Sequence, residues 1–225
     1  HNGTFDIGEK ASNGDVYVVT DAQGNYSGLG GSGAVHVFGG TDLYGTGLVF
    51  RGILLAPETS QVVTSLTTLV QSIRAGSNLS VDASVSAVKQ LLNLDSNVTT
   101  ADLLNLDPVE TAYASSTRAD KVKYLQLYST SAQVANVMVV GAAAVQKASA
   151  TLSTTQASQL VLDALAKSYA DLKSSQGASV QSVDLSKADF ISSVMQNVKG
   201  VSVSNASDIA TAVANVNAAL TDVLK

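Results

Sequence analysis

The sequence predicts an α+β fold: a small, glycine-rich antiparallel β unit over residues 1–56, followed by an alanine-rich multi-helix bundle over residues 57–225. Of the 17 glycines, 13 lie within residues 1–52, where β-branched and aromatic residues alternate with turn residues. After Pro57 the apolar residues, mostly Ala, Val and Leu, recur at the spacing of a helix face. Because both the composition and the period of the pattern change at Pro57, we place the domain boundary there.

Short segments of the first part have the composition of strands. The predicted strands are residues 15–20, 34–38 and 48–55, with residues 4–7 as a fourth strand at the edge of the sheet. A turn is expected at residues 21–25, where Gly24 can adopt a positive φ. A sheet of three or four short strands is weak by itself. We therefore expect this sheet to depend on the helices or on a strand from a neighbouring molecule.

The second part begins with three helices that have recognisable start and stop signals. An apolar stripe from Val62 to Ile73 predicts the first helix, which Gly76 would end. Ser80 and Thr99 are residue types that cap helix N-termini, and they precede the second and third helices. Pro108 would interrupt the third helix because proline cannot continue a hydrogen-bonded helix.

A long helical segment is expected from about residue 109 to residue 150, followed by helices at 155–173, at 186–199 and to the end of the chain. The long segment is predicted to pack through one apolar stripe, formed by Val122, Leu125, Ala132, Ala135, Val139 and Ala142. Ser186 to Asp189 resembles a capping box, and Gly200 would stop that helix. Asn205 or Ser207 would cap the last one.

The charge and composition of the chain argue against several classes of partner. The formal net charge of −5 does not suit a nucleic-acid surface, which needs clustered Lys and Arg. The chain has no cysteine, which excludes disulfides and thiolate chemistry. The longest apolar run, residues 137–145, is shorter than the roughly 20 residues that span a bilayer. We therefore expect no nucleic-acid partner and no membrane insertion.

Three motifs could be taken for enzymatic sites, and each has a simpler interpretation. Residues 28–33 match Gly-x-Gly-x-x-Gly, but a strand rather than a helix is predicted after them, so a hairpin loop is favoured over a nucleotide site. Ser86 and Lys89 match Ser-x-x-Lys without its companion motifs, which favours a solvated helix face. His36 would have to serve any catalytic triad, and no nucleophile elbow accompanies it. The sequence therefore predicts a protein that is not an enzyme and has no catalytic residues.

Segments around the predicted boundary carry a family resemblance. They are Phe38-Gly-Gly-Thr-Asp42, Phe50 to Pro57, the run that contains Thr67-Thr-Leu-Val70, Leu91 to Asp95, Thr99 to Asp102, and Asp107-Pro108. Together they resemble a module of very large bacterial secreted, adhesin-like surface proteins, over roughly residues 16–140; Ser65 stands where that pattern has proline. The resemblance implies a secreted or cell-surface location and a structural or adhesive function. It transfers no catalytic role.

Structural calcium would fit this resemblance. Asp21, Gln23 and Asn25 have the alternate spacing of a calcium loop, although Gln replaces an acid and no bidentate Glu follows. Asp15, Asp21 and Asp42 could converge at the sheet edge and supply carboxylates. The alternative, which we take as the default, is that these aspartates form ordinary Asx turns. No other cofactor is expected.

The partner predicted for this chain is a second copy of itself or an adjacent module of the same protein. An unpaired sheet edge favours strand addition, and residues 1–10 would be the donor, with Phe5 and Ile7 filling pockets on the acceptor. The alternative is an edge that the protein's own helices cover.

Two binding functions stay open beside the structural one. A pocket for a sugar or another small molecule could lie in the bundle, where Tyr113, Tyr124 and Tyr128 are candidate lining residues, although packing is the more frequent role of such tyrosines. The more remote alternative is copper binding through His1, because an N-terminal amine and imidazole suit Cu(II).

Overall fold

The computed structural model describes residues 17–29, 32–41, 49–50, 52–177 and 181–222. The chain forms two compact units, His1–Gly33 and Ala34–Lys225. The second unit holds both strands and all the described helices, which confirms an α+β fold with a helical bundle. The strands thus share a unit with the helices, and the change in composition at Pro57 does not coincide with the division between the units.

In the first unit, the predicted strand at residues 15–20 is not formed over its described part, Tyr17–Thr20. The turn that follows is present. The backbone N–H groups of Gln23 and Asn25 both donate to Asp21 Oδ1 at 2.9 Å. Gly24 adopts a φ of 82°, in the region that favours glycine. The local turn chemistry of Asp21 and Gly24 was therefore predictable, whereas the strand was not.

The sheet in the second unit has two antiparallel strands, β1 (Val35–Phe38) and β2 (Ile53–Ala56), with Val35 paired to Ala56. The first matches the predicted strand at residues 34–38, and the second is the end of the strand predicted at 48–55. Ile53, Leu55 and Ala56 are buried in the core, whereas His36 and Phe38 are exposed. The sheet is therefore held by one strand that belongs to the helical core.

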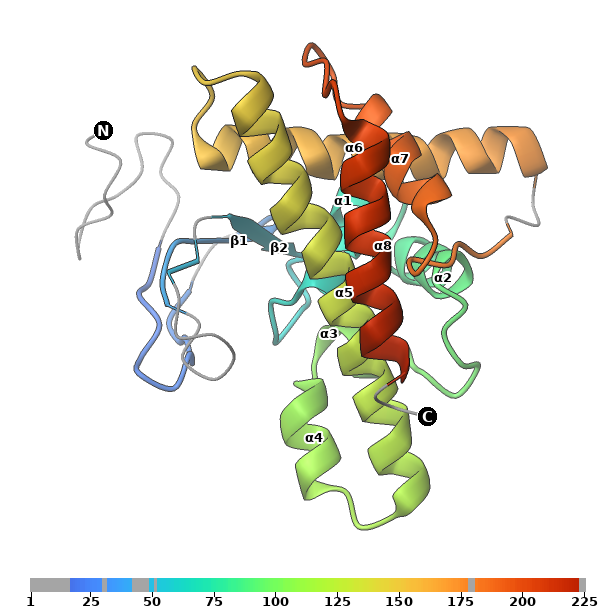
Figure 1. Cartoon of the computed structure of the whole chain (residues 1–225). Coiled ribbons are helices and arrows are strands. Elements are labelled where there is room, and N and C mark those ends of the chain that lie inside the picture. Colours follow the sequence, from blue (N-terminus) through green and yellow to red (C-terminus); the bar gives the residue numbers. More distant parts are fainter. Residues whose placement is uncertain (1–16, 30–31, 42–48, 51, 178–180, 223–225) are drawn as a thin grey trace. The chain divides into compact units, whose positions relative to one another are not determined.

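The helices follow β2 and make up most of the second unit (Figure 1). They are α1 (Ser65–Ser77), α2 (Val81–Leu91), α3 (Thr100–Leu104), α4 (Pro108–Ala114), α5 (Arg118–Ala148), α6 (Thr154–Gln176), α7 (Ala188–Gln196) and α8 (Ala206–Asp222). In Figure 1, α5 and α8 run side by side and α6 crosses behind them. The short helix α4 packs on the first turns of α5 as a helical hairpin.

Most of the predicted helix starts are confirmed. Ser80 accepts from Ala83 N at the start of α2, and Thr99 forms a capping box with Asp102 at the start of α3. The capping box predicted at Ser186 is wrong, because the Ser186 hydroxyl donates to Asp184 instead and α7 starts after Lys187. Asn205 directly precedes α8.

Two predicted helix boundaries are corrected by the structure. Gly76 does not end α1; it lies inside the helix, and Asn78, with a φ of 51°, provides the left-handed cap. The long segment predicted from residue 109 is two helices, because Asp107 and Pro108 begin α4 and Thr117 begins α5. Proline at the first helical position lacks only an N–H that would have had no partner.

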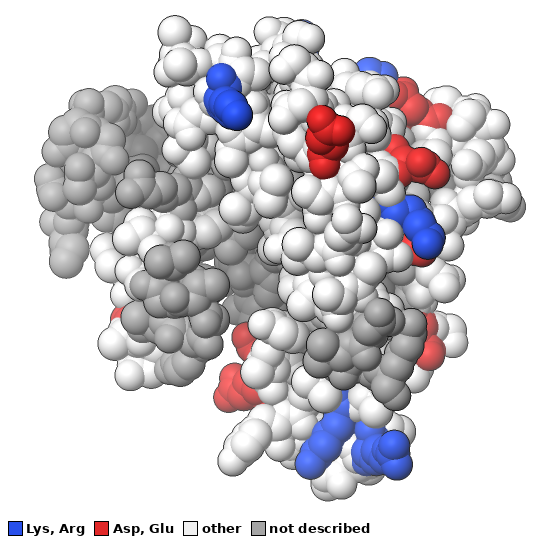
Figure 2. All heavy atoms as spheres, in the orientation of Figure 1, with Lys and Arg blue, Asp and Glu red and all other residues white. Residues whose placement is uncertain are grey.

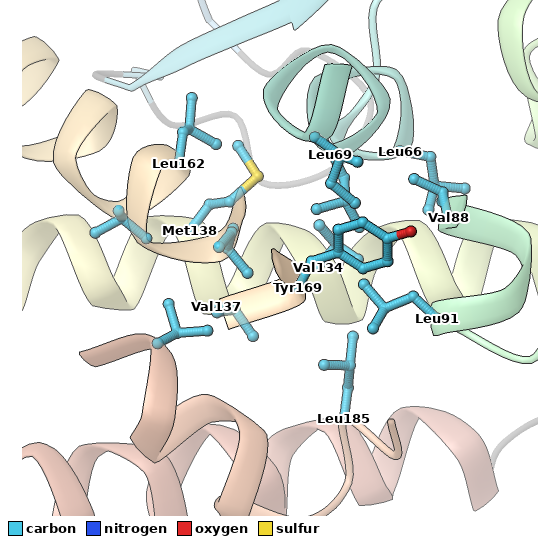
Figure 3. Packing of buried hydrophobic residues seen from close by; sticks show 14 of the residues in the cluster. Leu66, Leu69, Val88, Leu91, Val134, Val137, Met138, Leu162, Tyr169 and Leu185 are labelled. Carbon is cyan, nitrogen blue, oxygen red and sulfur yellow. The ribbon is translucent and has the colours of Figure 1, made fainter. Parts of the chain in front are cut away.

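The core lies between α1, α2, α5, α6 and α7, and Figure 3 shows part of it. Val134, Val137 and Met138 of α5 pack there with Leu162 and Tyr169 of α6. A Cβ atom on Gly141 would lie 3.1 Å from Val161 Cγ1 and 2.7 Å from Met195 Cε, so this glycine permits the close approach of α6 and α7 to α5.

The apolar stripe predicted to bury α5 is largely on the wrong side of the helix. Val122, Leu125 and Val139 are exposed, and Ala132 and Ala135 are only half-buried. The residues that α5 buries instead are Leu127, Ser129, Ser131, Val134, Val137, Met138, Gly141, Ala142, Ala144 and Val145. Only Ala142 belongs to both sets. Half of the predicted stripe therefore lies on the surface of the molecule.

Candidate functional site

The residues considered for calcium are placed only in part. Asp15 and Asp42 lie outside the described residues. Asp21 is exposed and its carboxylate is engaged by its own turn: Oδ1 accepts the two backbone N–H groups, and Asn25 Nδ2 donates to Oδ2 at 3.3 Å. The backbone hydrogen bond from Asn25 contributes most to lowering the Asp21 pKa below its ordinary 3.8. Within the described ranges, no group of three or more metal-ligating side chains could hold an ion.

The nucleotide and dyad motifs do not have the structural context that their chemistry needs. The described residues after Gly33 form strand β1, so no helix N-terminus is presented to a pyrophosphate there. Ser86 is exposed on α2, and the Lys89 ammonium donates to the backbone oxygen of Val98. Lys89 therefore holds the loop that follows α2.

Only one of the two histidines, His36, lies in the part of the chain that the structure describes. His1, like Phe5 and Ile7, lies outside the described residues. His36 is exposed on β1, with its ring centroid 6.0 Å from that of Phe38 on the same face. The alternation along β1 places these two rings on one side of the sheet, as the strand spacing predicts.

The three candidate tyrosines do not form a pocket. Tyr113 is 91% exposed on α4, and Tyr128 is 47% exposed on α5. Tyr124 is partly buried and its hydroxyl donates to Asp102 Oδ1 at 2.8 Å. The apolar hollow between Leu69, Leu91 and Phe190 is only about 10 Å³, which is close to the minimum for one water molecule. This hollow has no room for a sugar.

The most buried charge among the described residues is Asp102 in α3. Its carboxylate accepts hydrogen bonds from Lys123 Nζ at 2.7 Å, from Thr99 N at 2.7 Å and from Thr99 Oγ1 at 2.9 Å, in addition to the one from the Tyr124 hydroxyl. Burial acts to raise the Asp102 pKa, but these donors outweigh it and the pKa is lowered below 3.8. The Lys123 ammonium also lies 4.9 Å from the centre of the Tyr124 ring. With all these partners, Asp102 joins α3 to α5, which is a structural role.

A second polar cluster joins α8 to α5. Asn217 is fully buried; its Nδ2 donates to Leu185 O at 2.9 Å, and its Oδ1 accepts from Asn136 Nδ2 at 2.9 Å. Gln133 Nε2 donates to Thr221 Oγ1 at 2.8 Å, one turn further along. Gln133 thus pairs with Thr221, whereas Asn136, further along α5, pairs with the earlier Asn217 of α8. The two helices are therefore antiparallel. Hydrogen bonds thus hold this contact on one side of α5.

A third polar cluster explains the Thr-Thr pair at the start of α1. Leu55 N donates to Thr68 Oγ1 at 2.9 Å, and Thr67 Oγ1 donates to Leu55 O at 2.9 Å. The backbone N–H and C=O of Leu55 point away from β1 and bond to α1 instead of to a further strand. Helix α1 therefore closes that edge of the sheet. Of the two alternatives for the edge, covering by the protein's own helices is therefore realised along β2.

The remaining feature is a surface. Val122, Leu125, Tyr128, Val139 and Val140 of α5 are between 38% and 54% exposed. No charged residue occurs from Tyr124 to Gln146, so most of the outer face of α5 is uncharged. In Figure 2 the middle of the surface over α5 and α8 is correspondingly free of charged atoms. We call this surface, formed by the exposed apolar residues of α5, the α5 face.

Sequence reasoning identified most of these residues but assigned them to the core. No helix in the described part of the chain is both long and apolar enough to span a bilayer. Among the described residues, α5 carries more of the exposed large apolar side chains than any other element, which makes the α5 face the best candidate for a functional surface.

No protein-family model, no curated protein and no solved structure matches the chain.

Proposed function

We propose that this protein is a non-enzymatic structural or adhesive module of a bacterial extracellular surface protein, and that it acts by associating with other copies or with adjacent modules. The observation that supports this most directly is the α5 face, because large apolar side chains exposed together mark interaction surfaces. An uncharged face can be buried against a partner without the desolvation cost of a charge.

The polar clusters of the second unit support the same proposal. Asp102 joins α3 to α5, Asn217 joins α8 to α5, and Thr68 joins α1 to β2. Each group thus fixes one element on another, as expected of a scaffold that presents a surface.

The extracellular location rests on composition and resemblance. The chain is rich in Ser and Thr and contains no cysteine. Its Gly-Gly-Thr-Asp segment and its Thr-Thr-Leu-Val helix are similar to those of adhesin-like secreted proteins. Strand addition through Phe5 and Ile7 would be a further mode of association in such a protein.

Sedimentation velocity over a range of protein concentrations tests the proposal. We expect reversible association, with the weight-average sedimentation coefficient rising with concentration, and ordered oligomers in electron micrographs. A particle that stays monomeric up to the highest concentration would overturn it. If that monomer were stabilised by a small sugar in a thermal-shift assay, the ligand-binding alternative would replace it.

A further inference from the structure

Leu125, Tyr128 and Val139 of the α5 face, together with the half-buried Ala132 and Ala135 between them, have the residue spacing of a helix–helix seam. Leu125, Tyr128, Ala132, Ala135 and Val139 follow one another at intervals of three, four, three and four residues. This is the spacing with which one helix packs along another in a coiled-coil arrangement. Ala143, one turn further on, is also exposed. The stripe extends from residue 125 to residue 143, about 27 Å at 1.5 Å per residue.

The sizes of these side chains are arranged evenly about the middle of the helix. Ala132 and Ala135 form the centre, and the larger Tyr128 and Val139 lie four residues beyond them on either side. Small residues at the centre allow two helix backbones to approach closely, while the larger ones fill the space at the flanks. A face with this arrangement is complementary to a copy of itself turned end to end.

We propose that a second copy of this chain packs antiparallel on the α5 face, with a two-fold axis midway between Ala132 and Ala135. In this register Ala132 faces Ala135 of the other copy, and Tyr128 faces Val139. The proposal deepens the proposed function, on which it rests, by naming the partner and its orientation.

Charge decides between the antiparallel and the parallel orientation. A parallel pair in register would place the exposed Lys121 of each copy against its counterpart, close to both Arg118 side chains. In the antiparallel register Lys121 instead comes opposite Gln146, which carries no charge, so the repulsion is avoided. Helix dipoles also oppose one another favourably in the antiparallel pair.

General patch sizes agree with a two-copy contact. A patch of roughly 300–600 Å², the size of the largest apolar patch on a typical monomer, would bury about 600–1,200 Å² in all when two copies meet, which reaches the lower limit for a specific interface. The α8 helix lies beside the stripe, because its bonds to α5 are made through Gln133 and Asn136. A closed two-fold pair uses the same surface on both copies.

Sedimentation equilibrium of three variants tests the surface. Ala132→Glu and Val139→Glu place a carboxylate in the contact, and each is expected to weaken dimerisation about 100-fold or more. Ala83→Glu on the exposed side of α2 is the matched control, and it should leave the dimerisation constant unchanged. Circular dichroism of each variant verifies that the helices are intact.

Distance measurement between spin labels tests the orientation. Because the chain has no cysteine, Lys147→Cys gives a single labelling site. The antiparallel register places two such labels 27 residues apart along the pair, about 40 Å, whereas a parallel pair would place them within about 20 Å. Dimers with a short distance, or dimers that Val139→Glu leaves intact, would overturn the register while the proposed self-association stands. A chain that never dimerises would overturn both.

Discussion

Leu55 and Thr68 are joined by a hydrogen bond of 2.9 Å from the strand backbone to the helix side chain. The threonine hydroxyl takes the place that a neighbouring strand would occupy, so β2 ends the sheet against a helix. Thr67 completes the arrangement by donating to the carbonyl of the same residue. The two-stranded sheet therefore needs no further strand on this edge.

Thr68→Val is predicted to destabilise the protein by about 1–3 kcal/mol. Valine has nearly the same shape but leaves the buried N–H of Leu55 without a partner, and an unsatisfied buried donor costs that much. Urea unfolding measures the difference. Thr211→Val is the control, because Thr211 is exposed on α8 and bonds only within its own helix. It should change stability by less than about 0.5 kcal/mol. Equal losses for both variants would show that the bond to Leu55 contributes nothing.

Stability is predicted to fall in acid partly through Asp102. Its pKa is lowered in the folded state, so its contribution is present above the unfolded pKa of about 3.9 and is lost as pH falls through the folded value. Asp102→Asn should cost roughly 3 kcal/mol at neutral pH, because it leaves Lys123 without its partner. The difference from the unmodified protein should shrink toward pH 2.

Thermal unfolding at a series of pH values between 7 and 2 measures this effect. Asp163→Asn, at an exposed position on α6, is the comparison at neutral pH and should change stability by less than about 0.5 kcal/mol. If the loss caused by Asp102→Asn were the same at every pH, the carboxylate charge would not be what holds α3 on α5.

Asn217→Ala is predicted to loosen α8 selectively. The substitution removes the buried amide that bonds Leu185 and Asn136, and it should cost about 1–3 kcal/mol. Hydrogen exchange should become faster in α8, while α1 and α2 keep their protection. Asn215→Ala, exposed on the same helix, serves as the control. Uniformly faster exchange throughout the bundle would contradict a local role for Asn217.

Several features of the fold could be predicted because they depend on neighbouring residues. The caps at Ser80 and Thr99 and the turn at Asp21 are satisfied within a few positions of the chain, so residue type and spacing indicate them. Gly76 shows the limit of such signals. Glycine is typical of helix ends, but here the helix continues through Gly76, and Asn78, two residues further on, adopts the left-handed conformation.

The assignment of the α5 face depended on tertiary structure for a physical reason. The middle of α5 has apolar residues on both sides, so the helical period is present in the sequence but does not say which side is buried. Val134 and Met138 are buried because α6 and α7 approach over Gly141, while Val139 is exposed and Ala132 is only half-buried.

The local pattern of the chain thus established the class of fold, the positions of most helices and their caps, since these follow from interactions a few residues apart. Only the folded chain decided which face of α5 meets the core, that Leu55 is bound by Thr67 and Thr68, and that Asp102 is paired with Lys123. These contacts join residues 12 to 21 positions apart. Their formation depends on how whole helices pack, which residue spacing alone does not specify.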